Sequence, residues 1–151
     1  MPSDVVIGDN QLELTRFYGY PREAVFAAWT EPDQLDRWWG CDDTESCRSE
    51  IDLRTGGSFR HVMTLRGAGE MVVAGTYEEV VVPERLVTSS IMGEGTPYAF
   101  ESRTTVEFTE QDGGTLVRLV QVGLPPMPEG GQIVSAGTQA SLNKLEQHLA
   151  G

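Results

Sequence analysis

Only two histidines occur in this 151-residue chain, and histidine is the side chain whose ordinary pKa lies nearest neutral pH. His61 shares the phase of an alternating segment with Phe59 and Met63, which predicts that all three side chains face the interior of a sheet. His61 is therefore the one catalytic candidate. It is a weak one, because a lone histidine in such a place is usually a hydrogen-bonded wall residue. His148 lies near the end of a predicted helix, where we expect a surface or capping role.

Other kinds of site lack the residues they need. Cys41 and Cys47 have no histidine at a zinc-binding spacing, and the acidic residues 41–45 read as a solvated loop rather than a site for a hard cation. None of the serines and threonines has a partnered base or a nucleophile elbow. The glycine pairs at 56–57 and 113–114 lie in turns between strands, where they cannot form a phosphate loop. We expect no metal, no cofactor and two free thiols.

Charge and hydropathy restrict the partners and the compartment. Acidic residues outnumber basic ones 23 to 11, giving a formal net charge of −12. Such a surface repels phosphate backbones and anionic headgroups, so we expect neither a nucleic-acid partner nor a membrane partner. No apolar run is long enough for a membrane helix, and residues 1–10 lack the pattern of a signal peptide. We expect one cytoplasmic domain spanning residues 1–151.

Two short helical segments follow an alternating strand at residues 12–18. Pro21 suits the first position of the first helix, whereas Thr30 ends that helix and is a candidate cap for the second. Strands then follow, joined by turn signals such as Pro83-Glu84 and Asp112-Gly113-Gly114, and they are predicted at about 47–54, 57–66, 69–82, 85–92, 100–110 and 114–123. The proline-rich residues 124–128 cannot continue a strand, and a final helix of about 17 residues comes after them.

This order of segments is typical of an α+β fold in which one long helix covers a sheet. Several phrases resemble the START-like (SRPBCC) superfamily, in particular the branch related to the C-terminal domain of the activator of the 90-kDa heat-shock protein ATPase: Tyr20 to Gly40, Ile51 to Phe59, Gly75 to Val80, Pro83 to Val87 and Ser141 to Leu149. The resemblance spans nearly the whole chain. It implies a helix-grip fold, in which a curved antiparallel sheet of about six or seven strands wraps on a long C-terminal helix. Two short helices follow the first strand in this fold.

The first half of the final helix consists mostly of small residues, from Ser135 to Ser141, and a bulky stripe begins only at Leu142. Small side chains over a broad curved sheet leave volume unfilled, and an unfilled apolar volume forfeits packing energy. A cavity kept despite that loss is often one that a ligand occupies. The alternative is a filled core that Gly137 closes by letting the helix approach the sheet. The family pattern often carries a Gly-Trp pair where this chain has Gly137-Thr138, which implies a more open pocket here.

Strand phase, the Trp pair and the small-residue helix together predict the residues that bind the ligand: Trp38, Trp39, Phe59, His61, Met63, Tyr77, Thr88, Ser90, Val106, Phe108, Val117, Gly137 and Ser141. Leu65, Leu86 and Met92 share the inward phase of their strands. An inward arginine would suit a ligand carboxylate, and Arg103 is the residue to examine. Counting in twos from Val106, however, places Arg103 on the outer face.

Three functions stay open, because the fold alone does not choose among them. The leading hypothesis is a binding protein for a small hydrophobic ligand, lipid-like or aromatic, between the sheet and the final helix. The resemblance also implies a co-chaperone or stress-related interaction module, or a cyclase- or hydrolase-type enzyme that uses His61 on a polyketide-like substrate. The N-terminal domain that does much of the chaperone binding in such activators has no counterpart here, so we do not expect a chaperone partner. We favour a non-enzymatic protein, and a homodimer is compatible with the sequence.

Overall fold

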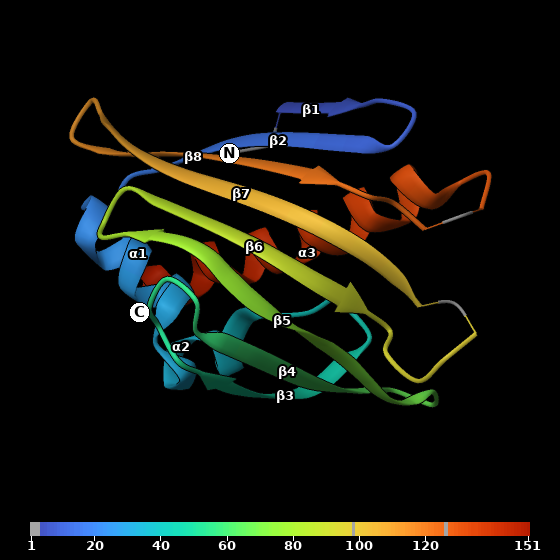
Figure 1. Ribbon diagram of the computed structural model, residues 1–151. Helices are drawn as coiled ribbons and strands as arrows, with labels where there is room; N and C mark the ends of the chain where they lie inside the picture. Colours follow the sequence, from blue (N-terminus) through green and yellow to red (C-terminus); the bar gives the residue numbers. More distant parts are fainter. Residues whose placement is uncertain (1–3, 98, 126) are drawn as a thin grey trace.

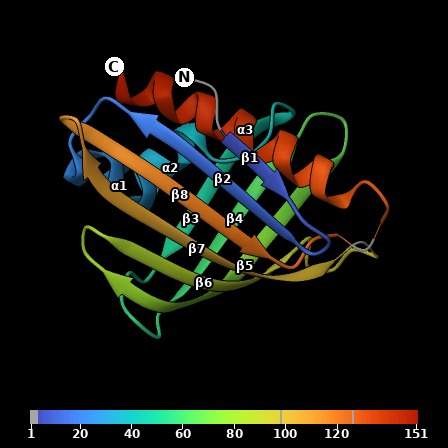
Figure 2. The ribbon, with the colours of Figure 1, turned by 90° about the horizontal axis from the view of Figure 1, so that it is seen from above.

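One curved antiparallel sheet and three helices make up the computed structural model, which describes residues 4–97, 99–125 and 127–151 (Figure 1). The strands lie side by side in the order β1-β2-β8-β7-β6-β5-β4-β3 (Figure 2). Their bounds are β1 Asp4–Ile7, β2 Gln11–Tyr18, β3 Thr44–Ile51, β4 Ser58–Leu65, β5 Gly69–Val81, β6 Arg85–Met92, β7 Phe100–Gln111 and β8 Gly114–Val122. The helices are α1 Arg22–Thr30, α2 Pro32–Trp38 and α3 Gly130–Leu149. The predicted α+β helix-grip fold is confirmed.

The sheet has eight strands rather than six or seven, because the predicted set omits β1. This strand is four residues long and pairs with β2 at the edge of the sheet. Val6 is 66% exposed there, so β1 lacks the alternation that signals a half-buried strand. β3 also begins and ends three residues earlier than the predicted strand at 47–54. It ends at Ile51 because residues 52–57 form a turn in which the Gly57 amide donates to the Arg54 carbonyl at 2.8 Å.

The hairpin between β7 and β8 follows the sequence prediction. Gln111 pairs with Gly114, leaving Asp112 and Gly113 as a two-residue loop. Both loop residues have positive φ, 49° and 77°, as a type I′ turn requires. This turn fixes the register that places Val106 opposite Leu119 on the inner face of the sheet.

The two short helices begin differently from the prediction. Pro21 is the N-cap of α1 rather than its first helical residue. The Thr30 hydroxyl donates to the Phe26 carbonyl within α1 at 2.9 Å, and Glu31 takes the N-cap position of α2. Thr30 therefore does not cap the second helix, because its hydroxyl is already used one turn back. Instead, the Trp38 indole N–H donates to the Ala28 carbonyl at 2.9 Å and joins α2 to α1.

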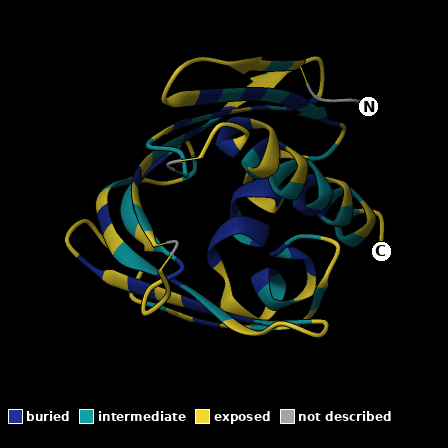
Figure 3. Ribbon diagram, turned by 90° about the vertical axis from the view of Figure 1, so that its right-hand side faces the viewer, coloured by how far each residue is buried: buried dark blue, intermediate teal, exposed yellow. Residues whose placement is uncertain are grey.

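The long helix α3 crosses the inner face of the sheet, whose strands curve around it when the molecule is viewed from its open end (Figure 3). It is 20 residues long, somewhat longer than predicted, because it begins at Gly130 directly after the proline-rich residues. No strand forms in the described part of that segment, and Pro126 lies outside the described residues. Tyr18 fastens the helix to the sheet by donating its hydroxyl to the Leu142 carbonyl at 3.0 Å.

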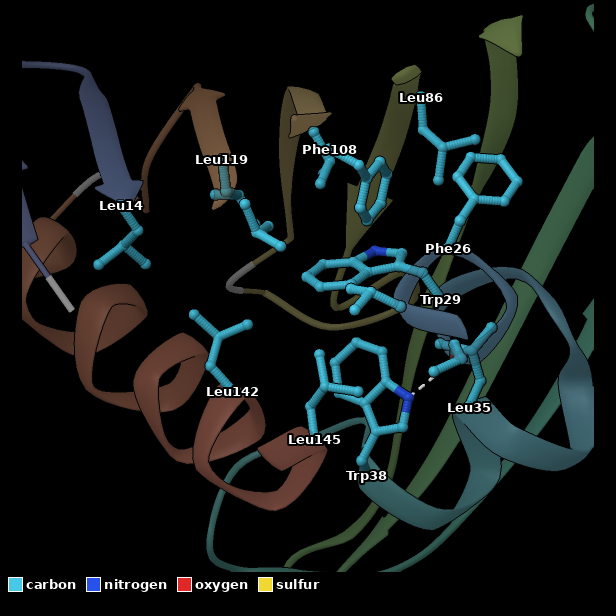
Figure 4. Close-up of a cluster of buried hydrophobic side chains, with 14 of the residues drawn as sticks. Leu14, Phe26, Trp29, Leu35, Trp38, Leu86, Phe108, Leu119, Leu142 and Leu145 are labelled. Atoms are coloured by element: carbon cyan, nitrogen blue, oxygen red, sulfur yellow. Dashed lines mark hydrogen bonds between the residues drawn. The ribbon is translucent and has the colours of Figure 1, made fainter. Parts of the chain in front are cut away.

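A cluster of buried hydrophobic side chains lies where α1, α2 and the second half of α3 meet the sheet (Figure 4). Leu142 and Leu145 extend from α3 towards Trp29 and Trp38 in this cluster. The two indole rings contact each other edge to face, with centroids 4.8 Å apart. None of the described helices is both long and apolar enough to cross a membrane.

A candidate ligand-binding cavity

A cavity of about 330 Å³ lies between the inner face of the sheet and the first half of α3. The small side chains of that half contribute to its roof, with Gly137, Thr138 and Ser141 among the lining residues. Trp38 and Trp39 form one wall, at the point where α2 ends and the chain turns towards β3. The cavity occurs where the helix sequence changes from small to bulky residues, because the leucines fill the corresponding space further along.

The two ends of the cavity differ in exposure. Trp38 and Leu86 are buried at the end covered by α1 and α2. At the other end, where α3 begins, the lining residues Met71, Phe100 and Pro125 are half-buried, and Ile133 is 52% exposed. The mouth of the cavity therefore lies at the start of α3, near the loops that join β4 to β5, β6 to β7 and β8 to α3 (Figure 1).

The structure brings together all the residues predicted to bind a ligand except two. The cavity is lined by Trp38, Trp39, Phe59, His61, Met63, Tyr77, Thr88, Ser90, Val106, Gly137 and Ser141. Their role in ligand binding stays a prediction. Phe108 and Val117 do not line the cavity. Each follows or precedes a lining residue of its strand, Val106 or Leu119, on the side towards α1, and lies in the buried hydrophobic core. Phe108 contacts the rings of Phe26 and Trp29 edge to face, at centroid distances of 5.2 and 5.6 Å.

His61 lies on the wall of the cavity, almost completely buried. Its Nδ1 is 2.8 Å from Ser49 Oγ on the neighbouring strand β3, and its ring stacks on Trp39 with centroids 4.6 Å apart. Burial lowers the pKa of His61 to about 4 from its usual 6.5. The ring is therefore neutral at neutral pH, and the catalytic role of His61 stays a weak prediction.

Ser141 connects α3 to the segment that carries Trp39. The Gly40 amide donates to Ser141 Oγ at 3.0 Å, and the same hydroxyl donates to the Gly40 carbonyl at 2.7 Å. Gly40 has φ of +109°, a conformation that favours glycine. Although Ser141 was predicted as a ligand contact, its hydroxyl is thus already used to position the chain after α2.

Several lining residues were not in the predicted set, including Met71, Val73, Phe100, Thr104 and Gln121. The signal for two of them was present, because Thr104 has the phase of Val106 in β7 and Gln121 has the phase of Leu119 in β8. Met71 and Val73 face Met63 and His61 across the β4–β5 pair, a register that a single sequence does not specify.

The lining carries no charge among the described residues, since it contains no Asp, Glu, Lys or Arg. Arg103 faces outwards as its phase predicts, is 58% exposed and pairs with Glu78 at 3.3 Å. Cys41 and Cys47 are free thiols. Within the part of the chain that the structure describes, no three His, Cys, Asp or Glu side chains gather closely enough to hold a metal ion.

A curved sheet that wraps a C-terminal helix and leaves an apolar cavity between them places this protein in the START/SRPBCC superfamily. Within it, the chain belongs to the family of activator of Hsp90 ATPase homolog 1-like (AHSA1-like) proteins, whose family model matches residues 19–150. No curated protein matches the chain significantly.

Solved structures share the fold over nearly the full chain. Protein CV1439 from Chromobacterium violaceum is 23% identical with a TM-score of 0.83, and the match covers 95% of this chain and 99% of that one. An AHSA1-like protein from Aeromonas hydrophila is 27% identical with a TM-score of 0.73, covering 93% and 92%. CalU16 from Micromonospora echinospora is 22% identical with a TM-score of 0.73, covering 99% and 87%. These likenesses show that the three solved structures share the fold of this chain.

Proposed function

We propose that this protein binds a small hydrophobic molecule, lipid-like or aromatic, in the cavity between the sheet and α3. The observation that carries the proposal is the cavity itself, about 330 Å³ in volume and lined mainly by apolar and aromatic side chains. This volume and lining are those of small-molecule sites in general. Trp38, Trp39 and Phe59 offer broad ring surfaces for a flat or flexible apolar ligand.

The energy of packing favours an occupied cavity. At about 24 cal/mol for each Å³ of empty apolar space, a dry cavity of this size would cost several kcal/mol. That is a large fraction of the stability of an ordinary domain. The chain nevertheless has small residues at Gly137 and Thr138, where larger ones would fill the space. A ligand would restore the missing contacts and stabilise the folded state by mass action.

The other two hypotheses receive less support. An enzyme that uses acid–base chemistry needs a group with a pKa near the working pH. In the lining, burial lowers the pKa of His61 to about 4 and raises the pKa of Tyr77 to about 12. A co-chaperone or other interaction module would use an outer surface of the protein, whereas the cavity on which the proposal rests is internal.

The direct test compares two tryptophan substitutions on the same helix. Thr138→Trp places a ring at the cavity roof, whereas Ala136→Trp places the same ring at an exposed position outside the lining. Purified protein is screened by thermal shift against apolar ligands, including fatty alcohols and polycyclic aromatics, and native mass spectrometry identifies any co-purified molecule. We expect ligands to stabilise the wild type and Ala136→Trp, and affinity to fall at least about tenfold in Thr138→Trp. Failure of every apolar ligand to stabilise the wild type would overturn the proposal.

A further inference from the structure

A row of polar side chains crosses the largely apolar floor of the cavity. Tyr77 of β5 pairs with Thr88 of β6, Thr88 pairs with Thr104 of β7, and Thr104 pairs with Gln121 of β8. All four side chains line the cavity. Because each is the direct cross-strand neighbour of the next, they form a continuous polar belt over four adjacent strands.

The belt has unused hydrogen-bonding capacity. Thr88 donates to the Thr104 carbonyl at 3.5 Å, and Gln121 Nε2 donates to the Gly123 carbonyl at 3.3 Å. Among the described residues, no partner is found for the Tyr77 hydroxyl, Thr104 Oγ1 or Gln121 Oε1. Tyr77 and Gln121 are only 4% and 5% exposed, yet none of these three atoms is among the fully covered polar atoms that lack a partner, so they are open to the cavity. Polar groups in such a place are nearly always satisfied by protein, by ordered water or by a ligand, so the belt offers its free hydrogen-bonding capacity to whatever fills the cavity.

Charge is missing from the same surface. No acidic or basic side chain lines the cavity in the described part of the chain. The cations beside α3 are engaged outside it: Arg16 with Asn143 and Glu146, and Lys144 with the Cys41 carbonyl at 3.2 Å. An ionised group buried here would lose its hydration without gaining a counter-ion, which is strongly unfavourable.

We propose that the ligand is an uncharged molecule that carries hydroxyl or carbonyl oxygens on a hydrophobic frame, and that these oxygens hydrogen-bond to the Tyr77–Thr88–Thr104–Gln121 belt. The inference rests on the proposed function and narrows its ligand class. Fatty acids and other organic anions are thereby disfavoured, while alcohols, phenols and ketones with a hydrophobic frame are favoured. The belt sets the orientation of the ligand, and the apolar walls supply most of the affinity.

Three probes with one ring system test this inference: fluorene, 9-fluorenol and fluorene-9-carboxylate. Their dissociation constants are measured by calorimetry near neutral pH and at high salt, which screens the net negative charge of the protein. The alcohol should bind at least about tenfold tighter than the carboxylate. The belt is tested separately, through the affinity for the alcohol relative to fluorene, because this ratio removes the contribution of the shared rings.

The variants are Thr104→Val and Tyr77→Phe, which remove hydroxyls while nearly conserving shape. Each should lower the relative affinity for the alcohol about fivefold. Thr105→Val is the matched control, because Thr105 adjoins Thr104 in β7 but does not line the cavity, and it should leave the ratio unchanged. Circular dichroism and thermal unfolding verify that each variant is folded.

The outcomes separate the two proposals. If the carboxylate binds as tightly as the alcohol, or if both belt variants keep the wild-type ratio, the inference is overturned while a hydrophobic binding function stands. If none of the three probes binds, the inference is overturned, and the thermal-shift screen against the wider set of apolar ligands decides whether the proposed function falls with it.

Discussion

The two ends of the space between the sheet and α3 are built from the same elements but are packed differently. At the α1 and α2 end, Leu142 and Leu145 of α3 pack with aromatic rings in the buried core, and this cluster closes the end of the cavity (Figure 4). At the other end, Gly137 and Thr138 face the sheet across a volume of about 330 Å³. One helix thus anchors the fold with its second half and roofs a cavity with its first half.

The strands show the same division. In β7, Phe108 lies in the filled end and Thr104 lies in the cavity, with Val106 between them. In β8, Val117 and Gln121 occupy the equivalent positions. Under the proposed function, stability and binding depend on different residues of the same inward face, and substitutions at the two ends should have separable effects.

The largest effect is expected from Phe108→Ala in the filled end. The ring is 1% exposed and contacts two other aromatic rings, so its removal should lower the free energy of unfolding by about 3–5 kcal/mol. Met92→Ala at the half-buried wall of the cavity should cost less than half as much, because its side chain already adjoins open volume. Chemical denaturation measures both values. Equal losses would contradict the division into two ends.

A smaller effect concerns the pH dependence of stability. The folded protein keeps His61 neutral down to about pH 4, whereas the unfolded chain protonates it with the usual pKa of 6.5. Between these values the unfolded state binds more protons, so the contribution of His61 to stability is lost as the pH falls from about 6.5 to 4. Between pH 7 and 4.5, the wild type should lose about 2 kcal/mol more than His61→Gln. Denaturant titrations at the two pH values measure this difference, and an identical loss in both proteins would refute it.

The smallest effect is expected from Gly137→Ala in the roof. A Cβ there would lie 3.7 Å from Cys41 Cβ, an ordinary contact, and alanine favours the helix over glycine. The substitution should raise the free energy of unfolding by about 0.5–1 kcal/mol. Gly131→Ala is the matched control on the same helix, because its Cβ would crowd Ile7 and should give no gain. A destabilised Gly137→Ala would show that the roof tolerates no added atoms.

Much of the fold was predictable because its signals are local. The type I′ turn at Asp112-Gly113 and the phase of the strands depend on neighbouring residues alone. Phase also predicted most of the lining residues that lie on strands, since it determines which face of the sheet a side chain occupies. It could not separate Phe108 from Val106, because only the position of α1, distant in sequence, decides which of them is covered.

The errors at other positions have the same origin. Strand β1 is short and exposed, so only its pairing with β2 defines it. The hydrogen-bond partner of the Thr30 hydroxyl depends on the geometry at the end of α1. The low pKa of His61 comes from the depth of burial, which the composition of one strand does not specify. Local chemistry thus predicted the elements, and tertiary contacts determined the properties of the site.

The tryptophans of the chain have a practical consequence. There are three, and all of them line the cavity: Trp29, Trp38 and Trp39. The tryptophan component of the intrinsic fluorescence, excited selectively at wavelengths where the four tyrosines do not absorb, therefore originates entirely from indoles at the edge of one compartment. Its emission would report filling, emptying or solvent entry there without an attached dye, and it would give little signal from events on the outer face of the sheet.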